Sequence, residues 1–487
     1  MSPSNFKLQT FVQTQHIASL HISNFKLYTS NFFMAIQSPP IFSLQAPKDI
    51  SVGEIEAELN QIWQSYGVAG DNGGIPAATR AKTFSLLVYE PEETQPLLAA
   101  LGFYSGPIDG IPGPRTASAV REAQKAYGLE KTGKVTAELL AKLREELVKR
   151  RGNVSGDNGS TTSYALDTKS PTIADAIASR NPCRIIALCP IGGDDEGVKA
   201  QVSAYCPIHK QSSTTLICCE YITLTGTFEA LERVVGMIPA LLIGGLPKFL
   251  WWKATPDPNN AIFKRLSAVS NSVIFDSSSL NEVEQNLVNI QELIEASIPV
   301  NDLNWSRLAA WQELTAEAFD PPQRRAALSE VDRVTIDYEK GNSSQALMFL
   351  GWLASRLNWL PDSYEEENGD YNIKRIQFVT EDQRKVEAEV AGVPTANVGD
   401  VPGDLIAIRL TSTNQEADCC TVVCSETTGC MRMELGGGAQ NCRFQQVSSL
   451  SDQGAEELLS QQLQRWGRDV LFEESLAVTA QMLKIKE

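Results

Sequence analysis

The chain has 487 residues, a formal net charge of −17 and 43% hydrophobic residues. At about 150 residues per domain, this length predicts roughly three domains with sizeable cores. The acidic balance, without long basic runs, disfavours nucleic acid and anionic membranes as partners, because Lys and Arg bind phosphate groups. Only three histidines occur, His16, His21 and His209. The first two lie in a polar N-terminal tail, so the folded body has one histidine, which leaves no His-rich metal site and few ways to build a His-based catalytic relay.

Residues 1–33 are polar, lack helical or alternating periodicity, and carry two lysines but no acidic residue. Neither the apolar core of a secretory signal nor the arginines of a transit peptide occur there. We expect residues 1–43 to be a disordered tail, or sequence upstream of a start at Met34. No run reaches the roughly 18 apolar residues of a membrane-spanning helix. The sequence therefore predicts a cytoplasmic protein whose ten cysteines are thiols, a metal site or a redox switch rather than a disulfide scaffold.

Helices and strands alternate on both sides of a smaller unit, which predicts one α/β domain built from residues 44–91 and 171–298. An apolar stripe predicts a helix over 49–65, and a β-rich run predicts a buried strand over 83–90. That strand and the apolar strand at 184–189 would form one βαβ crossover that contains the smaller unit. The other predicted elements are helices at 172–179, 228–238, 261–268 and 280–296, and strands at 199–205, 214–224, 248–253 and 272–276.

The smaller unit, residues 92–149, is predicted to hold three short helices and is followed by a polar linker at 150–170. Its motif LGFYSGPIDGIPGPRTASAVREAQKAYGLEKTGKVTAELLAKL resembles the peptidoglycan-binding-like three-helix domain. The Gly and Asp residues of the motif serve turns, so the resemblance argues for a fold and only weakly for a ligand. The predicted helices are 94–101, 117–127 and 136–147.

Residues 299–487 are expected to form a second α/β module that begins with a helix stopped by Pro321 and Pro322. The fold class is therefore mixed α/β, with two α/β modules and one small inserted domain. The predicted elements are strands at 331–338, 374–391, 404–413, 418–424 and 430–435, a helix at 344–357, and a last helix at 456–467.

No catalytic, cofactor or metal site emerges from the motifs. Gly-rich pieces at 192–197, 243–247 and 435–440 lack the spacing of phosphate-binding loops and are expected to be turns. The first piece, GGDDEG, could bind Mg²⁺, but an exposed acidic turn is the simpler interpretation. His209 could pair with Cys206 as a nucleophilic dyad, although their loop spacing does not fix that geometry. We expect an exposed loop histidine.

Ten cysteines fall into two groups. The first group lies in or beside apolar strands, and its members are expected to be small buried hydrophobic residues, as free Cys usually is. The members of this first group are Cys183, Cys189, Cys206, Cys218 and Cys219.

The second group is denser, in the segment DCCTVVCSETTGCMRMELGGGAQNC. It has no CxxC spacing and no nearby His, so zinc is not expected, and an iron–sulfur site would lack a known spacing. The segment predicts a hairpin with Cys424 and Cys430 on either side of its loop, where facing Cβ atoms lie about 4.5–5.5 Å apart. An accessible disulfide there would suit regulation. Cys419 and Cys420 are the fallback partners, and incidental thiols are the alternative.

Several stretches together resemble a known family. They are QAPKDISVGEIEAELNQIWQSYG with PAATRAKTFSLLVYEPEETQ, IASRNPCRIIALCP, LPKFLWWKATPDP, NDLNWSRLAAWQELTAEAFDPP and MFLGWLASRLNWLP. From about residue 44 to the C-terminus, the chain resembles the OpcA family of glucose-6-phosphate dehydrogenase assembly proteins. The inserted unit resembles that of the cyanobacterial form.

The resemblance implies a non-catalytic protein that promotes assembly and allosteric activation of glucose-6-phosphate dehydrogenase. That enzyme feeds the oxidative pentose phosphate pathway and makes NADPH. The resemblance also implies thioredoxin as a second partner, through redox control, and no cofactor. It supplies no interface residues. Two other classes stay open: a cell-wall (peptidoglycan) binding protein or wall hydrolase, suggested by the inserted unit, and an enzyme on an α/β scaffold.

Overall fold

The computed structural model describes residues 41–66, 77–106, 108, 113–152, 181–207, 215–367, 369–395, 401–414, 419–425, 430–437, 440–449, 454–465 and 467–486. Between 419 and 449 the description covers the backbone alone. The predicted tail with His16, His21 and Met34, the predicted helix at 172–179, and His209 lie outside the described residues. The domain boundaries expected from the sequence stay predictions.

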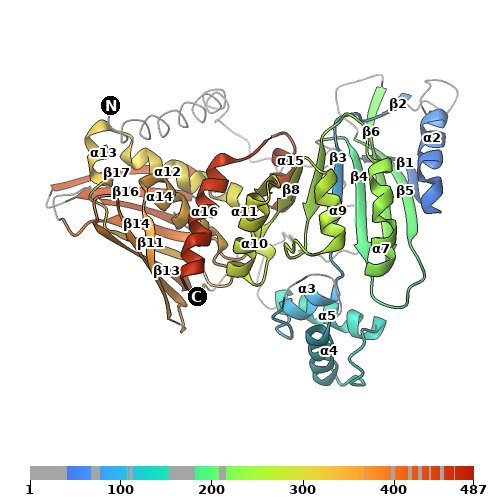
Figure 1. The fold of residues 1–487 in the computed structure, drawn as a ribbon, viewed down its shortest axis with the longest axis horizontal. Coiled ribbons are helices and arrows are strands. Elements are labelled where there is room, and N and C mark those ends of the chain that lie inside the picture. Colours follow the sequence, from blue (N-terminus) through green and yellow to red (C-terminus); the bar gives the residue numbers. More distant parts are fainter. Residues whose placement is uncertain are drawn as a thin grey trace. The chain divides into compact units, whose positions relative to one another are not determined.

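The first sheet has nine strands (Figure 1). Six of them run parallel in the order β6-β4-β3-β7-β8-β9. Of these six strands, β3 comes first in the chain and lies in the middle. The chain then moves outward through β4 to β6 and returns to β7 on the other side of β3. This is the doubly wound arrangement, and its switch point lies between β3 and β7. The strands are β1 (Ile41–Ile50), β2 (Ala77–Arg80), β3 (Ser85–Tyr89), β4 (Arg184–Pro190), β5 (Lys199–Pro207), β6 (Thr215–Gly226), β7 (Lys248–Trp252), β8 (Ser272–Phe275) and β9 (Val300–Asp302).

The predicted crossover is confirmed in that β3 and β4 are parallel neighbours, although the three-helix unit separates them in the chain. All five residues of β3 are buried, as expected for a parallel strand covered on both faces. The predicted first helix starts later than expected, because Asp49 and Ile50 belong to β1. Ser51 nevertheless caps it through a capping box with Glu54.

The two faces of the first sheet are covered from different parts of the chain. One face packs on helices α2 (Ile55–Tyr66), α7 (Phe228–Val234), α9 (Ala261–Val269) and α10 (Val283–Glu295). The other face packs on α15 (Ala455–Gln462), whose Leu458 and Leu459 join the cluster that contains Leu86 and Val88. A segment from the end of the chain therefore completes the first core. The short α8 (Ile238–Leu241) precedes β7.

The inserted unit has its own core, as predicted. Its helices are α3 (Thr94–Ala100), α4 (Pro114–Ala126) and α5 (Ala137–Gly152). They bury Leu97, Val120 and Leu143 among others. Gln124, buried on α4, fixes the second turn: its Nε2 donates to the Lys134 carbonyl at 3.0 Å, and its Oε1 accepts from Gly133 N at 2.9 Å.

The second sheet has eight strands in the order β11-β12-β13-β10-β14-β15-β16-β17. They are β10 (Arg333–Glu339), β11 (Leu360–Glu367), β12 (Ile373–Val379), β13 (Lys385–Val393), β14 (Leu405–Thr411), β15 (Cys419–Ser425), β16 (Cys430–Gly437) and β17 (Gln440–Ser449). The helices of this part are α11 (Leu303–Arg307), α12 (Ala309–Phe319), α13 (Pro322–Leu328), α14 (Ser344–Leu357) and α16 (Val470–Ile485).

Three predictions for this part were wrong. The single strand expected over 374–391 is two strands, β12 and β13, because the chain turns at Gln383 with φ 66°. Strands β11 and β17 were missed. The helix expected to be the last is α15, and α16 follows it. α16 has few polar positions and packs against α14 and α10, so it lacks the clear stripe of a surface helix.

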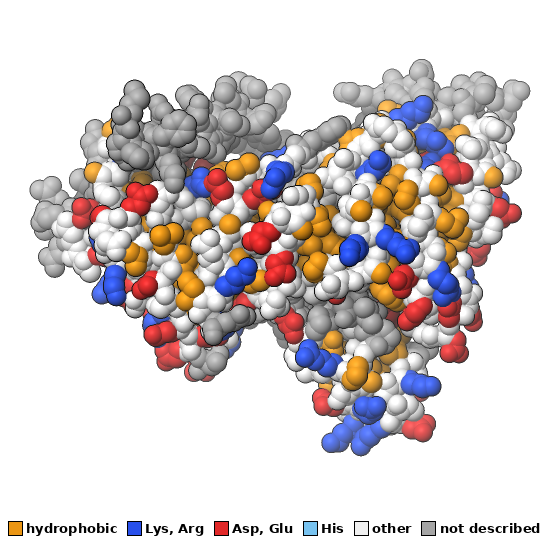
Figure 2. All heavy atoms as spheres, in the orientation of Figure 1, with side chains coloured by type: hydrophobic (Ala, Val, Ile, Leu, Met, Phe, Trp, Pro, Cys, Tyr) orange, Lys and Arg blue, Asp and Glu red, His pale blue; other side chains and the backbone are white. Residues whose placement is uncertain are grey.

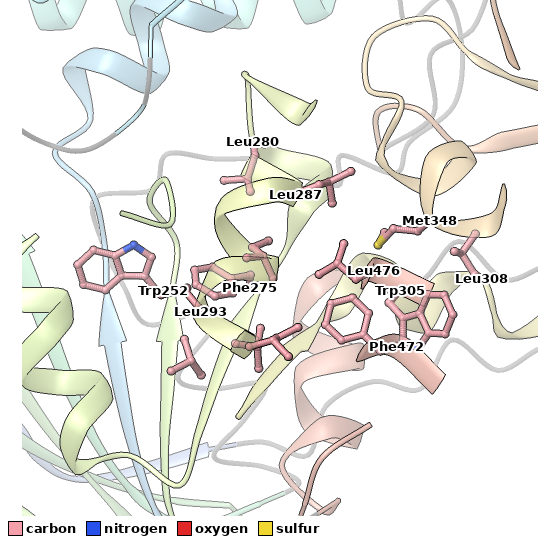
Figure 3. Close-up of a cluster of buried hydrophobic side chains, with 14 of the residues drawn as sticks. Trp252, Phe275, Leu280, Leu287, Leu293, Trp305, Leu308, Met348, Phe472 and Leu476 are labelled. Carbon is pink, nitrogen blue, oxygen red and sulfur yellow. The ribbon is translucent and has the colours of Figure 1, made fainter. Parts of the chain in front are cut away.

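An apolar cluster continues from the first sheet into the helices of the second (Figure 3). Phe275 and Leu293 lie on the side of the first sheet, and Trp305, Phe472 and Leu476 lie on the other side. The Trp305 and Phe472 ring centroids are 5.7 Å apart. No helix in the described part of the chain is long and apolar enough to cross a membrane.

Gly351 of α14 sets the approach of α16. A Cβ at this position would lie 2.5 Å from the Ser475 carbonyl oxygen and would overlap Thr479 Oγ1. We predict that Gly351→Ala lowers the free energy of unfolding by roughly 1–3 kcal/mol, the usual cost of overpacking. Thermal unfolding measures it. Gly53→Ala is the control, since nothing lies within 4 Å of its Cβ position. Equal stability of the two variants would contradict the packing account.

Candidate functional site

The carboxyl edge of the parallel strands at the switch point is where a doubly wound sheet usually holds its ligand. In dinucleotide-binding folds, a Gly-rich turn after the first strand brings backbone N–H groups to a pyrophosphate. Here the turn after β3 reads Glu90, Pro91, Glu92 and Glu93, and α3 begins at Thr94. This turn contains no glycine. It does contain three carboxylates, which would repel a phosphate.

These carboxylates already have partners in the protein. Both Glu90 oxygens accept hydrogen bonds from Lys253 Nζ, which follows β7, at 2.7 Å each. Glu92 accepts from Thr94 N at 3.0 Å and from Thr94 Oγ1 at 2.6 Å, so it bonds to the first residue of α3. Burial raises the pKa of the Glu92 carboxyl, partly offset by these bonds. The ion pair joins the two strands that flank the switch point.

The inserted unit also contacts this edge. Ile108 donates its backbone N–H to Thr255 Oγ1 at 3.0 Å and accepts from Thr255 N at 2.9 Å. Thr255 lies three residues beyond the end of β7. Glu93 pairs with Arg144 of α5. The turn after β3 is thus held by the protein's own side chains and by the unit inserted there.

The nearest thiol at this edge is not an activated nucleophile. Cys189 lies on β4, and burial, together with the negative charge of Glu90, raises its pKa to about 12. A thiolate is the nucleophilic form, so this cysteine is unsuited to covalent catalysis near neutral pH. Among the described residues, no group of three or more His, Cys, Asp or Glu could hold a metal ion.

The predicted turns are confirmed where the structure describes them. In GGDDEG, Asp195 accepts from Gly197 N at 2.9 Å and pairs with Arg233, so it stabilises the turn. In IGGLP, Gly245 has φ 73°, a left-handed turn conformation. LGGGAQ joins β16 to β17 and lies partly outside the described residues.

The expectation that Cys206 and Cys218 are thiols was wrong, because the structure joins them in a disulfide. The pairing of β5 with β6 places Tyr205 opposite Cys219, which brings the next positions, Cys206 and Cys218, face to face. Their Cα atoms are 4.2 Å apart. Both residues are buried. Sequence reasoning missed the pair because the register across β5 and β6 was not predicted.

The neighbouring cysteines in or beside the first sheet, Cys183, Cys189 and Cys219, are not part of a disulfide. Cys183 N donates to Cys219 Sγ at 3.3 Å. Burial raises the pKa of the Cys183 thiol, and the neighbouring Cys219 adds to the rise. For Cys183 and Cys219 the prediction of small buried residues is confirmed.

The C-terminal hairpin forms as predicted, with β15 antiparallel to β16. Its register pairs Cys424 with Met431 and Ser425 with Cys430. Cys424 and Cys430 are therefore one position out of register, not paired positions as expected. Cys419 is paired with Gly436 and Cys420 with Leu435. The described backbone does not test a disulfide in this group.

A buried polar cluster lies where β8 and β9 end. Arg307 donates to both oxygens of Asp276, at 2.8 and 3.0 Å. Burial alone would raise the pKa of Asp276, but Arg307 outweighs it and holds the pKa below its usual range. Asp302 Oδ1 accepts from Ser277 N at 3.0 Å and Asn304 N at 2.9 Å. Its Oδ2 has no hydrogen-bond partner among the described residues.

Asp302 is the member of this cluster whose charged form is least favoured. Burial, followed by the negative charge of Asp276, raises its pKa to about 6. The side chains of the cluster bond to one another and to the backbone that follows β8 and β9. No signal in the sequence marked it, because its members come from separate segments.

Comparison with known proteins places these features in a family. Two family models describe the N-terminal and the C-terminal domain of a "Glucose-6-phosphate dehydrogenase subunit", and they match residues 174–292 and 298–476 respectively. A third model, "Putative peptidoglycan binding domain", matches residues 90–143. A relative from Nostoc punctiforme, "Putative OxPP cycle protein OpcA", is 69% identical over 93% of this chain and 97% of its own length. The chain belongs to the OpcA family.

Other members of the OpcA family are also close. Relatives of the same name from Synechocystis sp. and Synechococcus elongatus are 54% and 49% identical, over 95% and 91% of this chain and 97% and 98% of their own lengths. The resemblance seen in the sequence is thus confirmed. A solved dehydrogenase from Chromobacterium violaceum aligns with a TM-score of 0.33 at 11% identity, over 53% of this chain and 82% of its own. This similarity is too low to indicate a shared function.

The raised pKa of Asp302 predicts a pH-dependent stability. The group binds its proton more tightly in the folded state, so stability is full below pH 4 and is lost as the pH rises through about 6. Asp302→Asn removes this loss, and we expect it to gain on the order of 2 kcal/mol over the native protein at pH 7.5, with the gain shrinking towards pH 4. Denaturant unfolding at both pH values measures it. A difference that does not change with pH would contradict the assignment.

The Cys206–Cys218 disulfide closes a short loop, with a sequence separation of 12. Closing such a loop stabilises a protein by roughly 3 kcal/mol. We predict that Cys206→Ala lowers the unfolding temperature by roughly 5–10 °C. Cys183→Ala is the control that leaves the bond intact. Alkylation of both Cys206 and Cys218 in the unfolded, unreduced protein would show that the bond is absent.

Proposed function

We propose that this protein is a non-catalytic assembly factor and allosteric activator of glucose-6-phosphate dehydrogenase. It would act in the cytoplasm and support NADPH production in the oxidative pentose phosphate pathway. Two observations support this proposal. The family models name a dehydrogenase subunit over most of the chain. The carboxyl edge of the sheet, where an enzyme of this topology would bind its nucleotide, is lined by Glu90, Glu92 and Glu93.

The carboxyl edge is the observation that carries the non-catalytic part of the proposal. A nucleotide would need backbone N–H groups or cations free to meet its phosphates. The cation there, Lys253, is already paired with Glu90. The protein would therefore act on the dehydrogenase by binding, and an activator must bind the active conformation more tightly than the inactive one.

We further propose that cysteines make the activation redox-dependent, with thioredoxin as the reducing partner. Cys424 and Cys430 flank the β15–β16 loop, so a bond between them would close a short loop without moving a domain. Their one-position offset in register means that bond formation would shift the pairing of β15 with β16 locally. Cys419 and Cys420 remain the fallback partners.

A second candidate function is binding to the cell wall. It is favoured by the match of residues 90–143 to a peptidoglycan-binding model. Cell fractionation separates the two: recovery with the cytosol supports the assembly factor, and recovery with the wall supports the alternative.

The assembly proposal predicts a kinetic effect. Adding the purified protein to purified glucose-6-phosphate dehydrogenase should lower the apparent KM for glucose 6-phosphate or shift the oligomeric state, because binding favours the active conformation. Initial rates and analytical size-exclusion chromatography measure both. Heat-unfolded protein at the same concentration is the control. Unchanged kinetics and no co-elution, with both reduced and oxidised protein, would contradict the proposal.

The redox proposal predicts that Cys424→Ser and Cys430→Ser each abolish the response of activation to thioredoxin. Peptide mapping of the oxidised protein should identify the bond. Cys183→Ser is the matched control, since Cys183 is a buried free thiol elsewhere. A redox response that survives in both hairpin variants would move the switch to Cys419, Cys420, the Cys206–Cys218 pair or the dehydrogenase itself.

A further inference from the structure

The later part of the inserted unit is basic, although the unit as a whole, residues 92–149, has eight Lys and Arg residues and eight acidic residues. Between Gly113 and Gly152 there are ten Lys and Arg residues and five acidic residues, a net charge of +5. The whole chain carries −17, so the remainder carries −22. Figure 2 shows several Lys and Arg side chains on this unit. A basic segment within an acidic protein points to an electrostatic role for that segment.

The cations of the unit differ in their partners. On α5, Lys142 and Lys149 pair with Glu145 and Glu146, and Arg144 pairs with Glu93. The cations of α4 and of the turn after it are exposed and have no acidic partner among the described residues. We call this set the basic face: Arg115, Arg121, Lys125, Lys131 and Lys134.

Four cations of the basic face, all except Arg115, lie on neighbouring parts of the unit. Arg121 and Lys125 are one turn apart on α4 and share a side of the helix. A Cβ at Gly133 would lie 2.8 Å from Arg121 Nε, so the turn that carries Lys131 and Lys134 lies against Arg121. Gln124 holds the same turn through the bonds described above. The backbone of the turn that carries Lys131 and Lys134 is therefore held in place before any partner binds.

We propose that the basic face docks on a carboxylate-rich surface of glucose-6-phosphate dehydrogenase, an inference that rests on the proposed function. Exposed cations without acidic partners are complementary to carboxylates and speed the encounter of two proteins. The unit also accompanies the family: alignments with the relatives from Nostoc punctiforme and Synechocystis sp. cover 93% and 95% of this chain, too much to leave the unit out.

The composition of the basic face favours a protein over a nucleic acid. Glu122 and Glu130 are interspersed with the cations, which opposes closely spaced phosphates but suits the mixed charges of a protein surface. The exposed positions of α4 hold no aromatic ring for base stacking. A long polyanion would also meet the net charge of −22 on the remainder of the chain.

The test compares two double variants of the full chain in binding to purified dehydrogenase. Lys125→Gln with Lys131→Gln removes two charges from the basic face. Lys142→Gln with Lys149→Gln removes two charges from the paired set on α5. We expect the first variant to bind roughly tenfold more weakly, mostly through a slower association rate, and the second to bind as the native chain does. Raising the salt concentration should weaken the native chain and remove the difference.

Thermal unfolding checks that both variants fold like the native chain. Equal binding by the native chain and the basic-face variant would overturn this inference while leaving the proposed function intact. No binding by the native chain would overturn both. A fluorescently labelled RNA oligonucleotide is the second probe: RNA binding that the basic-face variant loses, with dehydrogenase binding unchanged, would also overturn the inference in favour of nucleic acid.

Discussion

The side-chain amide of Asn342 is the point on which the joining of the two sheets depends. Its Nδ2 donates to three carbonyls just beyond β8, those of Ser277, Ser278 and Leu280, at 2.9, 3.0 and 3.3 Å. Its Oδ1 accepts from Ser344 N at 2.9 Å at the start of α14. Buried carbonyls that lose such partners cost free energy, so this residue ties the segment after β8 to the start of α14.

That constraint decides what the carboxyl edge of the first sheet can do. Beyond β8 and β9, Asn342 and the Asp276–Arg307 ion pair lie at this edge. Between β3 and β7, the Glu90–Lys253 ion pair lies at the same edge. A doubly wound sheet can therefore keep its topology while its usual ligand crevice is used for internal contacts. We propose that the surface offered to a partner lies elsewhere, on exposed groups such as the basic face.

Local patterns in the sequence predicted the parallel core well. The apolar runs at β3, β4 and β7 are buried on both faces, so each stands out without knowledge of its neighbours. The inserted unit was equally clear, because its turns need glycine and its core follows a three-helix pattern. The second sheet was harder: β11 contains Asp362, Glu365, Glu366 and Glu367, and nothing local marks such a polar strand.

The candidate site could be predicted only in part. The absence of a phosphate-binding loop was visible from glycine spacing alone. The ion pair of Glu90 with Lys253, the polar cluster at Asp302 and the Cys206–Cys218 bond were not, because each depends on strand order or register between distant segments. Register likewise showed that Cys424 and Cys430 are not paired positions. Long-range pairing is the information that periodicity in one sequence lacks.

The most direct measurement of the central claim is a pair of calorimetric titrations of the purified full chain. One uses glucose-6-phosphate dehydrogenase and the other uses NADP⁺. The account predicts saturable heat with the dehydrogenase and none with NADP⁺, because the acidic turn after β3 repels a pyrophosphate. Saturable binding of NADP⁺ to the chain alone, with no binding of the dehydrogenase, would contradict it.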